Sequence, residues 1–253
     1  MTWDKFFWLL IDNANKYFVV AAPFFVFFYI VYRKKFSYSK IQLRFPKLKD
    51  YVREMFFSTL SIIIFSVPPL FMLYNESIRP HTTFYEDINA YGIPYLIIAF
   101  PLMLIIHDSY FYWIHRMMHL PVFFKWFHLI HHKSNNPSPW AAYAFHPLEA
   151  IVESMIFVIF LFVIPVHAIH LTFFFVFSLL YNVYGHLGFE LYPKGFSKHW
   201  FGKWINTSVS HNQHHQYFRG NYGLYFTIWD RLMGTLRSDY DSVYDEIKER
   251  NKN

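Results

Sequence analysis

Residues 154–189 read SMIFVIFLFVIPVHAIHLTFFFVFSLLYNVYGHLGF and contain no Asp, Glu, Lys or Arg. A helix crosses the hydrocarbon layer of a bilayer with about 20 mostly apolar residues, so this run is too long for one span. Pro165 stands near its middle, and proline ends or kinks a helix. The run therefore predicts a helical hairpin that turns near Pro165 to His170, with two arms that are each barely long enough to cross.

Three more uncharged stretches precede the hairpin. They are residues 17–32, 55–75 and 88–106, and Pro68-Pro69 predicts a kink in the second. The alternative, buried helices of a soluble protein, is disfavoured because four such stretches are hard to hide in a soluble core. The sequence predicts an all-α integral membrane protein, with about four transmembrane helices and a cytoplasmic helical cap that carries the histidine motifs.

Composition excludes several classes of protein. Of the 253 residues, 55% are hydrophobic, 24% aromatic and only 16% charged. Disordered and collagen-like chains are poor in aromatics or periodic in glycine, so they are excluded. The chain has no cysteine, which excludes disulfides, iron–sulfur clusters, thiolate metal sites and thiol nucleophiles.

The distribution of Lys and Arg predicts the orientation in the membrane. Residues 33–54, RKKFSYSKIQLRFPKLKDYVRE, are strongly basic, whereas residues 75–92 contain a single basic residue of the Lys or Arg type, Arg79. Because short basic loops lie on the cytoplasmic side, we expect residues 33–54 and everything after about His186 to be cytoplasmic. A bacterial inner membrane and an endoplasmic reticulum both fit this topology.

A second basic cluster contributes to the net charge of +6. It would contact anionic lipid headgroups or an acidic protein partner. Nucleic acid is not an expected partner, because the basic residues flank membrane spans and no recognition module is present. The cluster consists of Lys194, Lys198, Lys203, Arg219 and Arg231.

Fifteen histidines form the most distinctive pattern. WIHRMMH (113–119) has the spacing HxxxH, while FHLIHH (127–132) and SHNQHH (210–215) have the spacing HxxHH. On a helix, positions i, i+3 and i+4 share one face, so each motif presents its imidazoles as a patch. Protonated imidazoles so close together would repel, and neutral ones need partners, so we expect bound cations.

The eight imidazoles of these motifs exceed the four to six ligands of one ion, which predicts two ions. Imidazole suits Fe, Zn, Cu and Ni, so the ligand type alone leaves the metal open. A metal pair beneath an aromatic-rich apolar bundle favours redox chemistry on a lipid, because inert C–H bonds need a strong oxidant. Two irons could supply the electrons that cleave O2.

An ordered set of motifs contains these groups. It comprises HDSYFYWIHRMMH (107–119), FHLIHHKS (127–134), AFHPLE (144–149), NVYGHLGFE (182–190), SHNQHH (210–215), NYG (221–223) and WDRLMGT (229–235). Over roughly residues 95–240 the chain thereby resembles the fatty acid hydroxylase / sterol desaturase superfamily of integral-membrane di-iron oxygenases. The resemblance implies O2-dependent hydroxylation or desaturation of an acyl chain, a sterol or a related lipid.

The resemblance also implies the metal ligands by motif position. His186 matches a position that supplies a ligand in several branches, and Asn182 stands where the fatty acid 2-hydroxylase branch has a histidine, which favours the sterol-desaturase-like branch. The implied ligands are His115, His119, His128, His131, His132, His186, His211, His214 and His215.

Five residues near the motifs are further candidates for the catalytic site. His146 would be an extra ligand or hydrogen-bond to one. Asp108 and Glu149 would accept the second ring N–H of ligand histidines, or be ordinary interfacial carboxylates. His107 would support the ligands or pack at a helix end, and Asn182 completes the set.

The expected reaction takes a lipid from the bilayer, O2, and two irons reduced by a separate electron donor such as a cytochrome b5-like protein, ferredoxin or reductase. Zinc could replace iron on purification. A metal-binding scaffold, sensor or transporter without turnover is the alternative. The predicted division of the chain is an N-terminal part with transmembrane helices and the basic loop (1–90), the di-metal domain (91–240) and a polar tail (241–253).

Overall fold

The fold was analysed in a computed structural model, which describes residues 3–250 and is almost entirely helical. The long helices are α1 (Trp3–Phe25), which continues as the π-helical η1 (Val26–Val31), α2 (Leu48–Phe65), α4 (Gly92–Met118), α7 (Pro147–Val163) and α8 (Ala168–Gly185). The shorter α-helices are α3 (Val67–Leu73), α5 (Pro121–Phe127), α6 (Leu129–His132), α9 (Ser208–Tyr217), α10 (Ile228–Leu232) and α11 (Tyr240–Glu249). Single 3-10 turns are η2 (Ser37–Ser39), η3 (Arg79–His81), η4 (Pro139–Tyr143), η5 (Phe196–Lys198) and η6 (Gly202–Trp204).

Four helical stretches of the described residues are long and apolar enough to cross a membrane, as predicted. They are Trp3–Val31, Leu48–Leu73, Gly92–Met118 and Ala168–Gly185. The second has the predicted kink: α2 ends at Phe65, and α3 begins at Val67 directly before Pro68-Pro69. The third is longer than predicted, because α4 does not end at Ile106 but continues to Met118. The HxxxH motif is therefore a direct extension of a membrane helix.

The predicted hairpin is present, with α7 and α8 joined by residues 164–167, but of its two arms α8 alone is among the four candidate spans. Within this turn, β2 (Val166–His167) pairs in parallel with β1 (Phe84–Tyr85), with Phe84 opposite Val166. Phe160 of α7 packs edge-on against Phe174 of α8, with ring centroids 4.8 Å apart. Such close packing holds helices together in lipid, where burial from water contributes little.

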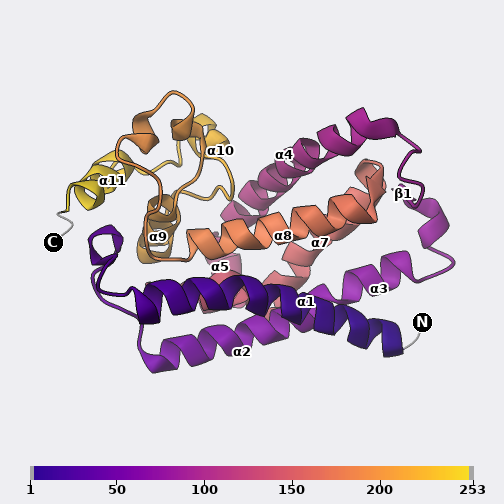
Figure 1. The fold of residues 1–253 in the computed structure, drawn as a ribbon, viewed down its shortest axis with the longest axis horizontal. Helices are drawn as coiled ribbons and strands as arrows, with labels where there is room; N and C mark the ends of the chain where they lie inside the picture. Colours follow the sequence, from indigo (N-terminus) through magenta and orange to yellow (C-terminus); the bar gives the residue numbers. More distant parts are fainter. Residues whose placement is uncertain (1–2, 251–253) are drawn as a thin grey trace.

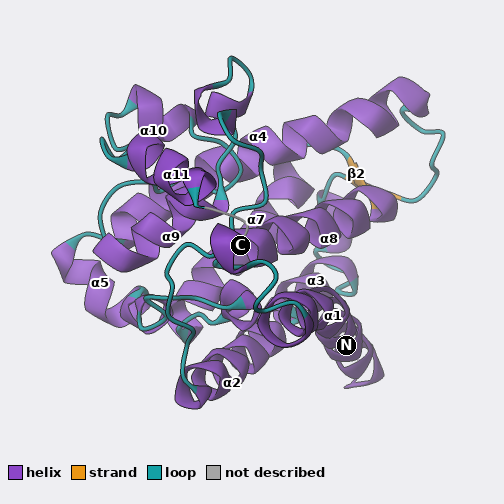
Figure 2. Cartoon of the chain, turned by 60° about the vertical axis from the view of Figure 1, so that its left-hand side comes forward, coloured by secondary structure: helices purple, strands orange, loops and turns teal. Residues whose placement is uncertain are grey.

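The short C-terminal helices form a cap at one end of the bundle. Figure 1 shows α9, α10 and α11 gathered at the end opposite to α3, β1 and the N-terminus. In Figure 2, β2 again lies at the end of the bundle far from α9 and α10. The polar tail contains most of α11, whose Tyr244 and Ile247 pack against Val209 and Ile41. Residues 251–253 of this tail lie outside the described residues, and the three-part division of the chain stays a prediction.

Candidate metal centre

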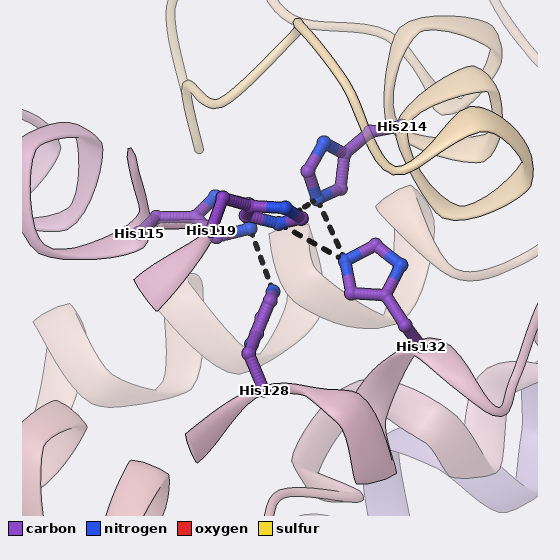
Figure 3. Close-up of side chains that lie close together, drawn as sticks. All are labelled: His115, His119, His128, His132 and His214. Carbon is purple, nitrogen blue, oxygen red and sulfur yellow. Dashed lines mark hydrogen bonds between the residues drawn. The ribbon is translucent and has the colours of Figure 1, made fainter. Parts of the chain in front are cut away.

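All nine histidines named as candidate ligands lie in two buried or nearly buried clusters at the cap end of the bundle. Within each cluster the facing ring nitrogens all lie within 4.8 Å of one another. The five-histidine cluster, shown in Figure 3, consists of His115, His119, His128, His132 and His214. The four-histidine cluster consists of His131, His186, His211 and His215. Their role as ligands is a proposal, developed below.

The two HxxHH motifs are divided between the clusters in opposite senses. In the motif at α6, His128 and His132 belong to the five-histidine cluster, and His131 belongs to the four-histidine cluster. In the motif on α9 the outer pair, His211 and His215, joins the four-histidine cluster, and His214 crosses to the other. The sequence predicted that the three imidazoles of each motif form one patch. In the structure the side chains at i and i+4 belong to one cluster, and the side chain at i+3 belongs to the other cluster.

Each cluster contains a triangle of Nε2 atoms. Those of His119, His132 and His214 are all 3.1 Å apart. In the four-histidine cluster, Nε2 of His186 is 3.0 Å from that of His211 and 3.1 Å from that of His215, and the last two are 3.1 Å apart. The other rings, those of His115 and His128 in one cluster and His131 in the other, lie beside these triangles.

These triangles cannot be satisfied by hydrogen bonds alone. An Nε2 atom of a neutral imidazole is either a donor or an acceptor, so at least two of any three mutual neighbours are of the same kind and repel. Burial lowers the pKa of His132, His211 and His214 well below the usual value, so protonation does not resolve the conflict. A cation bound to all three Nε2 atoms of a triangle would turn every repelling lone pair into a ligand.

The distances within the triangles fit a metal. Imidazole nitrogens lie about 2.1 Å from a first-row ion, so ligands at right angles are about 3.0 Å apart and tetrahedral ones about 3.4 Å. The measured edges of 3.0 to 3.1 Å match one face of an octahedron. The residues present therefore fit a metal ion in each cluster.

Carbonyl groups orient at least three of the rings. Nδ1 of His115 donates to the carbonyl of Tyr222 at 2.9 Å, and Nδ1 of His214 donates to that of Gly220 at 2.8 Å. Nδ1 of His186 donates to the carbonyl of Asn182 at 2.8 Å. Because a carbonyl only accepts, the proton is on Nδ1, and the Nε2 lone pair points into the cluster.

A carboxylate supports a fourth ring. Oε1 of Glu149 lies 2.6 Å from Nδ1 of His128, and both side chains are almost completely buried. Such a contact fixes the tautomer of a ligand histidine and raises its basicity. Glu149 thus lies where it could support His128 as a ligand, and this role stays a prediction.

The motifs NYG and WDRLMGT contact each other and shape the loop over the five-histidine cluster. The buried Asp230 carboxylate accepts hydrogen bonds from the backbone N–H groups of Tyr222 (2.9 Å) and Gly223 (2.8 Å). Position 223 requires glycine, because a Cβ there would lie 2.2 Å from the carbonyl oxygen of Phe226. Sequence reasoning assigned no role to these motifs. In the structure they place the carbonyl group of Tyr222 against His115.

We predict that Asp230→Asn will loosen this loop. The amide group would turn a donor toward at least one backbone N–H, leaving a buried group unpaired at a cost of about 1–3 kcal/mol. The melting temperature of the purified protein should fall, and its bound metal should exchange faster with a chelator. Asp245→Asn, at a partly exposed carboxylate of α11 that pairs with Lys198, is the control and should change both far less.

Four further candidate residues lie outside both clusters. Asp108 accepts hydrogen bonds from the backbone N–H groups of Tyr225 (2.8 Å) and Phe226 (3.1 Å), so it holds the same loop and no ligand ring. Nδ1 of His107 is 2.9 Å from the Tyr225 hydroxyl. The half-buried His146 caps α7 through the backbone N–H of Leu148. Asn182 donates its side-chain amide to the carbonyl of Ala142 at 2.7 Å.

A largely apolar cavity of 420 Å³ lies inside the bundle, next to residues that contact the clusters. At one end it is lined by Phe111, whose ring is 4.9 Å from His115, and by Phe145, whose ring is 5.0 Å from His131. Along α8 it extends from Ala168 to Asn182, which is about 21 Å at 1.5 Å per residue. Its volume and shape suit an elongated lipid.

Fold and site together define an integral membrane protein that can hold two metal ions beside a lipid-sized cavity. Residues 100–235 match the fatty acid hydroxylase family model, and the chain belongs to this family. It is therefore an oxidoreductase that hydroxylates or desaturates a lipid in a membrane. No solved structure matches the chain.

The similar curated proteins belong to the sterol-desaturase-like branch. The chain is 33% identical over 240 residues to the Delta(7)-sterol 5(6)-desaturase erg3C of Aspergillus fumigatus, covering 87% of this chain and 73% of the relative. It is 29% identical over 243 residues to the Delta(7)-sterol 5(6)-desaturase ERG3B of Gibberella zeae, covering 95% and 72%. The lathosterol oxidase of Rattus norvegicus is 32% identical over 206 residues, covering 80% and 67%.

Proposed function

We propose that this protein is a di-iron, O2-dependent desaturase that introduces a double bond into a sterol or a similar ring lipid. The observation that carries the proposal is the pair of histidine clusters at the end of an apolar cavity. The names of the similar proteins, sterol desaturases and lathosterol oxidase, support the class of substrate and reaction.

The proposed reaction balances with one external donor. The lipid loses two hydrogen atoms from neighbouring carbons, and O2 takes these together with two electrons and two protons to give two waters. Two iron ions, held by the five and four histidines, would supply the redox chemistry that O2 reduction needs. The chain itself offers no cysteine or second redox centre among its described residues, so we infer that a separate protein delivers the electrons.

The residues around the site have definable tasks in this reaction. The carbonyl groups of Tyr222, Gly220 and Asn182 keep three imidazoles in the ligating tautomer. Phe111 and Phe145 form the boundary between the cavity and the clusters. A lipid that fills the cavity displaces water from this boundary and brings its C–H bonds next to the ligand rings.

The basic loop supports a cytoplasmic position for the clusters. Its Gln42 side chain donates to the side chain of Asn212 on α9 at 2.9 Å, and Arg53 donates to the carbonyl of Lys133, next to His132. The loop and the histidines therefore lie at the same end of the bundle. Since basic loops face the cytoplasm, we propose that the metal centre does too, in an inner membrane or an endoplasmic reticulum.

The proposal is tested with purified protein in lipid nanodiscs. We expect about two iron ions per chain, and conversion of lathosterol to a diene sterol that requires O2 and a reduced donor such as cytochrome b5 with its reductase. Mass spectrometry of the sterol and elemental analysis of the protein are the two measurements. A single zinc ion with no conversion of lathosterol or fatty acyl lipids would instead support a metal-binding protein without turnover.

A further inference from the structure

Glu153 is a buried carboxyl group with an unused hydrogen-bonding atom in the wall of the cavity. The residue is 9% exposed, and it lines the cavity on α7. Its Oε1 is buried and has no hydrogen-bond partner among the described residues. No ion pair found in residues 3–250 includes it. An unpaired buried carboxyl is costly, so its presence in an apolar wall calls for a partner that the chain does not provide.

Several other polar groups around the cavity already have partners. Asn182 donates to the carbonyl of Ala142, and His107 contacts the hydroxyl of Tyr225. The hydroxyl of Ser154 donates to the carbonyl of Ile151 at 2.7 Å. At the far end, Lys16 pairs with Asp12, and Arg79 pairs with Glu86. Among the described residues that line the cavity, Glu153 is the one with a buried side-chain oxygen that lacks a hydrogen-bond partner, and this gives it capacity to recognise a ligand.

We propose that Glu153 binds the hydroxyl group of the substrate lipid, an inference that rests on the proposed function and deepens it. A hydroxyl donates to a carboxylate, and it also accepts from a protonated carboxyl, so it is a suitable partner in either state. The carboxyl group is a specificity determinant, and the apolar remainder of the cavity takes the rest of the lipid.

The position of Glu153 also restricts where the lipid is oxidised. Glu153 lies one helical turn, about 5–6 Å, from Glu149, which contacts His128 of the five-histidine cluster. A hydroxyl held there lies close to the ligand rings, so the reacting carbons are close to the hydroxyl in the lipid. This fits oxidation of sterol ring carbons near the hydroxyl, and it does not fit oxidation far along a chain.

The test compares lathosterol with an analogue that lacks only the hydroxyl. For the wild type we expect a preference for lathosterol of about 10- to 100-fold in kcat/KM, which is the effect of losing one hydrogen bond to a carboxyl group. In Glu153→Leu the preference should fall to nearly one, mainly through a higher KM for lathosterol. Glu153→Gln, which retains hydrogen-bonding atoms, should restore part of the preference.

A binding measurement separates recognition from turnover. Lathosterol should raise the melting temperature of the wild type more than the deoxy analogue does, and this difference should vanish in Glu153→Leu. Ser154→Ala is the matched control: it removes a polar group from the same wall whose hydrogen bond is already made, so the preference should persist. A carboxyl group with a purely structural role would shift the melting temperature in Glu153→Leu and leave the preference intact.

The outcomes distinguish the two proposals. A wild type that converts lathosterol without preferring it over the analogue, or a Glu153→Leu variant that keeps the preference, overturns the role of Glu153 alone. A wild type that neither binds nor converts either sterol overturns the proposed sterol substrate, and with it this inference.

Discussion

His131→Ala is expected to remove one of the two proposed metal ions and to lower lipid turnover by more than about 100-fold. The four-histidine cluster would retain three imidazoles, and loss of a direct ligand weakens a site by more than the 10- to 100-fold typical of the groups that support ligands. Elemental analysis of the purified variant measures the metal content, and sterol conversion measures turnover.

The adjacent residue provides a matched comparison. His132→Ala truncates the same side chain one position along the chain, but it leaves four imidazoles in the five-histidine cluster. We expect this variant to retain both ions after purification and to lose one of them only on treatment with a chelator, with turnover reduced. If both variants lost the same ion, or if His131→Ala kept full turnover, the division of the HxxHH motif between two clusters would be wrong.

Glu149→Leu is expected to lower metal affinity or turnover by about 10- to 100-fold. The substitution leaves Nδ1 of His128 buried without its acceptor, so the ring loses the contact that fixes its orientation and basicity. Chelator titration of the loaded protein and the initial rate of sterol conversion are the measurements.

Two companion variants identify the cause of the loss. Glu149→Gln keeps an oxygen that can accept from Nδ1, and should therefore lose less affinity than Glu149→Leu. Glu246→Gln changes a largely exposed carboxylate on α11, and should match the wild type. Equal losses in the Leu and Gln variants would show that charge, and not the acceptor, is what His128 needs.

The helices and the histidines were accessible from the sequence because both depend on local patterns. Long uncharged runs gave the four spans, and Pro165 and Pro68 marked the turn and the kink. The limits of α4 were harder to predict, since its apolar run ends at Ile106 while the helix continues into the polar motif. Hydropathy predicts which residues lie in the hydrocarbon layer, but it does not predict how far a helix continues outside that layer.

The assignment of each histidine to a cluster was not accessible, because it depends on how α4, α6, α8 and α9 meet in space. His128 and His131 share a motif but face different partners from distant segments. The contribution of Tyr222 and Gly220 was hidden for a different reason: each acts through a backbone carbonyl, which carries no signal in its side chain. The proposed role of Glu153 was hidden because it depends on the lack of a hydrogen-bond partner among residues 3–250, which the sequence does not show.

The crossed arrangement of the two HxxHH motifs has a mechanical consequence. Neighbouring side chains on one turn serve different clusters, and His132 and His215, from opposite clusters, have ring centroids only 5.0 Å apart. The two clusters thus touch through α6 and α9, while α4 contributes His115 and His119 to one cluster and the end of α8 contributes His186 to the other. A thicker or thinner bilayer would tilt these long helices, so a change in membrane thickness would act on both histidine clusters as well as on the cavity.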